Sequence, residues 1–160
     1  MKIKPILYLL TFTLLAVSCN DSSTEPGNDE TGTISGTITF VGENCPAANL
    51  SVGIYTNWYP QGPPVAYTPL NSENIDNGSY IYSITEVPIP GTYAATFVAW
   101  EDVDSVNANS GQNQQYTLGL YGSTFDFTTG MLTTPTPITL TSDSSVQTGV
   151  DITASCSLIP

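Results

Sequence analysis

No basic side chain follows Lys4 in this chain of 160 residues. The two lysines, Lys2 and Lys4, lie at the start, whereas all fourteen acidic residues lie between Cys19 and Pro160. No carboxylate in that part can form a side-chain salt bridge, so water, salt or bound cations must balance its negative charge.

The same absence excludes several classes of function. Nucleic-acid binding needs cationic side chains against phosphate. Ser-His-Asp and Cys-His catalysis, and zinc held by histidine, need an imidazole, and the chain has no histidine. A glycosidase with paired carboxylates is the one familiar hydrolytic chemistry that remains, but a small domain leaves little room for its cleft. We therefore predict a protein that is not an enzyme and does not bind nucleic acid.

The first residues have the layout of a secretory signal. Residues 1–18 combine a short basic start with an apolar stretch, residues 6–17, that is too short to span a bilayer. The sequence "LLAVSC" that follows resembles a bacterial lipobox, with Ala16 where leucine is usual. The resemblance implies cleavage before Cys19 and attachment of lipid to it, which would anchor the protein in the bacterial cell envelope, most simply the outer membrane. The alternative is an ordinary cleaved signal in which Cys19 is incidental.

The next segment is polar and acidic. Residues 19–31 are rich in turn-forming residues and carry too little apolar surface to build a core, so they predict a flexible tether. The remaining residues, 32–160, have the length of one domain. Whether that domain faces the periplasm or the cell surface is left open by the sequence.

Residues with alternating polarity recur throughout the domain. In "TISGTITFV", Ile34, Ile38 and Phe40 alternate with serine and threonine, the pattern of a strand with one buried face. No helical periodicity follows the leader, and glycine and proline interrupt the chain every few residues. Six further segments carry strand signals, which predicts an all-β fold of seven strands in two sheets. They are "LSVGIY", "SYIYSITEV", "TYAATFVAWE", "QYTLGLYG", "PITLTS" and "TGVDITA".

Two longer stretches resemble the transthyretin-like domains, also called carboxypeptidase regulatory-like or prealbumin-like domains. They are "GTISGTITFVGENCPAANLSVGIYTN" and "DNGSYIYSITEVPIPGTYAATFV". In the second, the residues that match the family pattern are Gly78, Tyr80, Pro90, Gly91 and Tyr93. The resemblance implies a seven-stranded, two-sheet immunoglobulin-like or transthyretin-like sandwich. It also implies an accessory, adhesive or scaffold role, because the family mostly supplies such modules.

Two cysteines remain once Cys19 is assigned to lipid. Export to an oxidising compartment favours a bond between Cys45 and Cys156. The resemblance supports it, since in transthyretin-like sandwiches the first strand runs parallel to the last or last-but-one strand, which would bring both cysteines to the same end. The alternative is two buried free thiols.

One acidic segment has the composition of a cation-binding loop. In "AWEDVDSVNANSGQN", side-chain oxygens of Asp102, Asp104 and Asn107 are closely spaced, and Ca²⁺ is bound by six to eight oxygens. However, Val106 stands where an EF-hand loop requires an oxygen. Two interpretations stay open, a calcium-binding loop and a solvated turn at the end of a hairpin.

One loop is rich in aromatic residues. "TNWYPQGPPVAYTP" contains Trp58, Tyr59 and Tyr67, which would either contact a ligand or cap one end of the sandwich. Together these features predict a non-enzymatic, lipid-anchored envelope domain that binds, adheres or acts as a scaffold, with an envelope protein or polysaccharide as partner. The alternative is a carbohydrate-binding module that uses the loop at Trp58 and Tyr59.

Overall fold

The computed structural model describes residues 30–159 apart from positions 44, 47, 107–112 and 127–130. Regular structure in these ranges is almost entirely β-strand, which confirms the predicted all-β class. Its helical segments are two single turns of 3-10 helix, η1 (Ser72–Asn74) and η2 (Cys156–Leu158). The described part of the chain has no helix with the length and apolar character needed to cross a bilayer. The predicted leader, the lipid site Cys19 and most of the tether lie outside the described residues.

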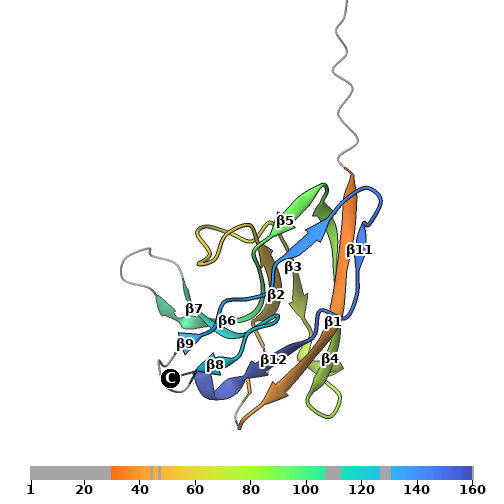
Figure 1. Ribbon diagram of the computed structural model, residues 1–160. Coiled ribbons are helices and arrows are strands. Elements are labelled where there is room, and N and C mark those ends of the chain that lie inside the picture. The colour runs from red at the N-terminus through yellow and green to blue at the C-terminus, as the bar shows by residue number, and fades with distance from the viewer. Residues whose placement is uncertain (1–29, 44, 47, 107–112, 127–130, 160) are drawn as a thin grey trace, which may run out of the picture.

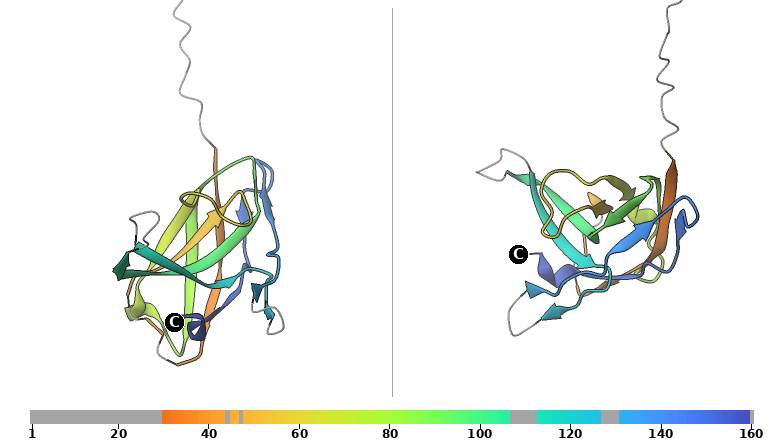
Figure 2. Two further views of the ribbon diagram at one scale, coloured as in Figure 1. Left: turned by 90° about the vertical axis from the view of Figure 1, so that its left-hand side faces the viewer. Right: turned by 45° about the horizontal axis from the view of Figure 1, so that its top comes forward.

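The first sheet is built around β1. This strand pairs antiparallel with β4 along one edge and parallel with both β11 and β12 along the other. The two views of Figure 2 show β1, in orange, beside the blue C-terminal strands from the opposite end of the sequence. The strands of this sheet are β1 (Thr31–Val41), β4 (Ser79–Pro88), β11 (Val146–Gln147) and β12 (Ile152–Ser155).

The second sheet is antiparallel and has the order β3-β2-β6-β7. Its strands are β2 (Leu50–Tyr55), β3 (Ala66–Leu70), β6 (Ala95–Val106) and β7 (Asn113–Leu120). Two short ribbons complete the described fold (Figure 1). One pairs β5 (Gly91–Tyr93) with β10 (Ile138–Leu140), and the other pairs β8 (Phe125–Asp126) with β9 (Met131–Leu132).

The two sheets form a sandwich-like arrangement around one main hydrophobic core. Alternate residues of each strand point into it, as the sequence pattern predicts: Ile34 and Ile38 on β1 are fully buried, and Phe40 packs against the cluster. The largest fully buried side chains in the described residues are Ile34, Ile38, Ile54, Ile84, Leu118, Leu120, Leu140 and Ile152, followed by Val52, Val87, Val98 and Val150.

A buried tyrosine ties the core to the loop before β12. The Tyr82 hydroxyl donates a 2.7 Å hydrogen bond to the carbonyl oxygen of Val150. Burial is the main cause that raises the pKa of Tyr82 well above its usual value, and the nearby charges of Asp151 and Tyr121 raise it further. The hydroxyl therefore stays neutral and keeps its donor role at physiological pH.

Two glycines allow backbones to approach closely between neighbouring segments. A Cβ atom on Gly36 would lie 2.2 Å from the carbonyl oxygen of Val150, and one on Gly119 would lie 2.1 Å from that of Thr153. Real Cβ atoms do not come so close to a backbone oxygen, so only glycine fits at either place. Gly36 thus allows β1 to pack closely against the C-terminal segment, and Gly119 allows β7 to pack closely against β12.

Each of the seven segments predicted as strands contains a strand in the structure. Asn77 and Gly78 form a tight turn before β4, because both residues have positive φ, 49° and 77°, and backbone hydrogen bonds join Asp76 and Ser79 in both directions. The aromatic loop was predicted too long: the chain is irregular only as far as Val65, and β3 follows at once. The sequence analysis thus missed β3, and it also missed the short strands β8, β9 and β11.

Candidate functional site

The two remaining cysteines form the predicted disulfide. Cys45 and Cys156 are bonded, with their Cα atoms 5.0 Å apart, a normal separation for such a bridge. Cys45 follows β1 and Cys156 begins η2 directly after β12. Because β1 and β12 run parallel, both cysteines leave the sheet at the same end, which is the arrangement that the resemblance implied.

The acidic segment is only partly described. Asp102 and Asp104 lie near the end of β6, where the pairing with β7 is irregular between Asp102 and Val106. The Asp102 carboxylate accepts a 3.0 Å hydrogen bond from the backbone N–H of Asp104, the local contact of a turn. Asn107, the third predicted ligand, lies outside the described residues. Within the described ranges no three acidic or cysteine side chains come close enough together to hold a metal.

The three aromatic residues singled out in the sequence do not form one surface. Trp58 is half-buried and packs on a small cluster at the outer face of the second sheet, and its ring stacks on that of Tyr59 at 4.4 Å between centroids. Tyr59 is 65% exposed. Tyr67 lies on β3, in the wall of a different hollow. Trp58 therefore covers part of a sheet face and not an end of the sandwich, whereas Tyr59 and Tyr67 present a ring to solvent.

The hollow beside Trp58 is small and mainly apolar. It encloses about 420 Å³ between the loop after β2, strand β7 and the ribbon of β8 and β9. Its described lining residues are Trp58, Tyr59, Thr117, Met131 and Leu132. Its polar groups are the hydroxyls of Tyr59 and Thr117 and the indole N–H of Trp58, and it contains no amide or carboxylate side chain.

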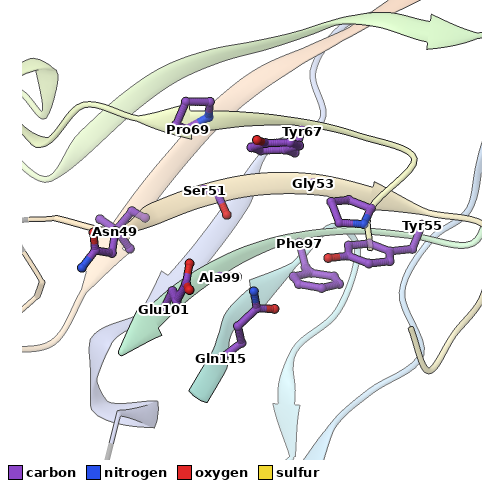
Figure 3. A pocket seen from close by; sticks show the side chains of 12 residues that line it. Asn49, Ser51, Gly53, Tyr55, Tyr67, Pro69, Phe97, Ala99, Glu101 and Gln115 are labelled. Carbon is purple, nitrogen blue, oxygen red and sulfur yellow. The ribbon is translucent and has the colours of Figure 1, made fainter. Parts of the chain in front are cut away.

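A groove of about 330 Å³ crosses the outer face of the second sheet (Figure 3). Strand register explains how residues far apart in the sequence meet there. Tyr67 pairs with Gly53, which in turn pairs with Phe97 on β6. Side chains along a strand alternate between faces, so residues two positions further along form the next row of the same face. That row contains Pro69, Ser51 and Ala99, and the one beyond it contains Glu101 and Gln115 with Asn49 at the strand end.

Small residues at the centre of the sheet make the depression. Gly53, Ser51 and Ala99 occupy β2 and β6, so the floor is low, whereas Tyr67 stands on the edge strand β3 (Figure 3). Pro64, from the loop after β2, lies over the Gly53 end; a Cβ atom on Gly53 would be 3.1 Å from the Cβ of this proline. The groove therefore has one aromatic wall and a floor with few protruding atoms.

The two ends of the groove differ in chemistry. At one end Tyr55 and Phe97 stack with centroids 4.5 Å apart and ring planes within 8°, and both are almost fully buried. Burial raises the pKa of the Tyr55 hydroxyl, which stays neutral. At the other end the side chains of Glu101, Gln115 and Asn49 offer amide and carboxylate groups (Figure 3). The site thus joins apolar ring surface to polar groups, as small-molecule sites do.

Sequence reasoning identified Tyr67 but missed the rest of this groove. One signal was available: in "TYAATFVAWE" apolar residues occupy both faces of the strand, so Phe97 and Ala99 point away from the main core and are buried nonetheless. A strand whose second face is also apolar needs a cover or a ligand on that face. Comparison with protein-family models, curated proteins and solved structures finds no match for this chain.

Proposed function

We propose that this protein is a lipid-anchored binding module of the bacterial cell envelope, held in the membrane by lipid on Cys19 and extended from it by the tether of residues 19–31. The observation that carries the proposal is the order of parts in the sequence: a signal-like leader, "LLAVSC", an acidic linker and one domain. The disulfide between Cys45 and Cys156 supports it, because such bonds persist in oxidising compartments outside the cytosol.

The domain itself is, in this proposal, a transthyretin-like or immunoglobulin-like sandwich. The parallel pairing of β1 with β12 and the antiparallel pairing of β1 with β4 support this sandwich type. Such a domain offers exposed sheet faces and loops rather than a deep cleft, and this favours adhesion, scaffolding or ligand binding over catalysis.

The composition supports a role without catalysis. From Cys19 onward the chain lacks lysine, arginine and histidine, which removes the usual bases and phosphate-binding groups. Glu101 is the one carboxylate among the described residues that line the groove, whereas a glycosidase uses two. The partner is an envelope protein or a polysaccharide.

Metabolic labelling with an alkyne fatty acid tests the anchor. The full-length chain, expressed in a Gram-negative host, should take up the label and sediment with outer-membrane markers in a density gradient. The Cys19→Ala variant should lose the label and leave the membrane fraction. Equal labelling of wild type and variant would contradict the proposal, as would a wild-type protein without label.

A further inference from the structure

We propose that the groove on the outer face of the second sheet binds a neutral polysaccharide. This inference rests on the proposed envelope function and names the ligand of that module. Tyr67 supplies an aromatic surface for a sugar ring. Gln115, Asn49 and Ser51 supply hydrogen bonds to sugar hydroxyls.

The first argument is the exposed ring of Tyr67. Its side chain is 62% exposed on a strand of a folded sheet, and its register partner Gly53 has no side chain to cover it. One face of the ring is thus left beside the open floor of the groove (Figure 3). A sugar ring carries C–H groups on one face and hydroxyls around its edge, so it can pack on an aromatic ring and still form hydrogen bonds.

The second argument is the set of polar groups beyond the ring. Glu101 and Gln115 are register partners on β6 and β7, and the backbone N–H of Glu101 donates a 3.0 Å hydrogen bond to the carbonyl oxygen of Asn49. These contacts hold the three residues together at one end of the groove. Amide side chains both donate and accept hydrogen bonds. A hydroxyl also does both, so a ligand rich in hydroxyls can pair with these amide groups.

The third argument is charge. No basic residue follows Lys4, so a phosphate, sulfate or uronate group in the groove would meet only negative charge. Anionic polysaccharides, nucleic acid and lipid headgroups with phosphate are disfavoured for the same reason. An uncharged chain of sugars avoids that repulsion, and this distinguishes it from most other envelope polymers.

The fourth argument is length. Asn49 directly precedes β2 and lies four residues before Gly53, which corresponds to about 13 Å of extended chain. The floor between them is lined by Ser51 and Ala99, both small. This span is longer than a single sugar ring, so the groove suits a segment of a polymer rather than a monosaccharide.

Affinity electrophoresis on gels that contain one polysaccharide each provides the test. The full-length chain is extracted in a detergent without a sugar headgroup, because a glycosidic detergent would compete. The neutral probes are starch, galactomannan, arabinoxylan and mixed-linkage β-glucan, and alginate is the anionic probe. We expect at least one neutral polymer to retard the protein and alginate to leave its mobility unchanged.

Variants then assign binding to the groove. Tyr67→Ala should raise the dissociation constant for the retarding polymer about tenfold or more, and Gln115→Ala should raise it severalfold. Tyr67→Trp should retain most of the affinity, since it keeps an aromatic face. Tyr59→Ala is the matched control, because Tyr59 is as exposed as Tyr67 but lies outside the groove, and it should bind like wild type. Equal melting temperatures establish that the variants are folded.

Three results would overturn the inference: no retardation by any neutral probe, retardation by alginate alone, or a loss in Tyr59→Ala as large as that in Tyr67→Ala. A proline-rich peptide that binds wild type but not Tyr67→Ala would assign the groove to a protein partner instead. None of these results affects fatty-acid labelling at Cys19, so the groove can fail while the envelope function stands. Conversely, an unlabelled wild type contradicts the envelope function whatever the gels show.

Discussion

The outer faces of the two sheets are built differently. On the first sheet, the outward residues of β1 and β4 are mostly serine and threonine, and the two large aliphatic side chains among them, Ile81 and Val41, are 85% and 41% exposed. On the second sheet, the outward residues Tyr55 and Phe97 are 8% and 6% exposed and stack on one another. One face is therefore wetted by short polar side chains, whereas the other is packed with rings.

This difference shows that only part of the second outer face is used for structure. Trp58 and Leu132 cover the cluster that contains Phe97, so that half of the face acts as a small second core. Tyr55, Phe97 and Ala99 of this cluster also line the groove, which extends beyond them to the exposed ring of Tyr67. Apolar surface of this kind that the fold leaves uncovered marks a site of interaction, and this is why the ligand is placed here and not on the first sheet.

Removal of the disulfide should have the largest effect and should act on the first sheet. The bond closes a loop with a sequence separation of 111 residues and joins the ends of β1 and β12. We expect Cys45→Ser/Cys156→Ser to lower the free energy of unfolding by roughly 4–5 kcal/mol. Hydrogen exchange measured by mass spectrometry should speed up more in β1 and β12 than in β2 and β6. Faster exchange in the second sheet alone would contradict the prediction that the disulfide stabilises the first sheet.

Truncation of an outward side chain should change the free energy of unfolding by different amounts on the two outer faces. Phe97→Ala removes a ring that is buried and stacked, so it should cost about 3 kcal/mol of unfolding free energy. Ile81→Ala, the matched change on the first sheet, removes an exposed side chain and should cost less than about 0.5 kcal/mol. Urea denaturation of both variants measures the two values. Similar losses would mean that the two outer faces do not differ as described.

The inward face of the second sheet carries a polar group that can be removed. Thr96 is fully buried, and its side-chain oxygen has no hydrogen-bond partner among the described atoms. Valine has nearly the same shape without the hydroxyl, so Thr96→Val should raise the free energy of unfolding by about 1 kcal/mol. Thr39→Val, on the exposed outer face of β1, is the control and should change it by less than about 0.5 kcal/mol. A destabilised Thr96→Val would indicate that the hydroxyl is satisfied.

The smallest effect is expected at the end of β6. If Asp102 and Asp104 respond to cations, millimolar CaCl₂ at constant high ionic strength should raise the melting temperature of wild type by about 2 °C relative to EDTA. Asp102→Asn/Asp104→Asn should respond less. An equal response of the two proteins would show that the segment is a solvated turn.

Strand positions were predictable where the pattern is local. The alternation around Ile34 and Ile38 depends on neighbouring residues, and its prediction is confirmed. The turn at Asn77 and Gly78 is equally local. Strand β3 was missed because its short sequence contains Pro69 and follows a proline-rich run, which is a signal for a loop. Proline is tolerated there because β3 pairs only with β2 in the described sheet and so lies at its edge.

The groove was not predictable because its residues come from four strands and from the loop after β2. Ser51, Ala99 and Gln115 carry no motif, and each is unremarkable in its own segment. They meet because the register of β2, β6 and β7 places them on adjacent rows of one face, and a shift by one residue would send them to the other face. Local patterns cannot specify such a register between distant segments.

Composition and local periodicity thus establish the all-β class, the acidic character and the absence of any basic side chain after Lys4. These properties depend on residue types and on neighbours within a few positions. The parallel contact of β1 with β12, the disulfide between Cys45 and Cys156, and the groove on the partly covered outer face of the second sheet arise from long-range packing. Such packing depends on how distant strands share one core, because each strand can bury its apolar face only against partners that the chain brings to it.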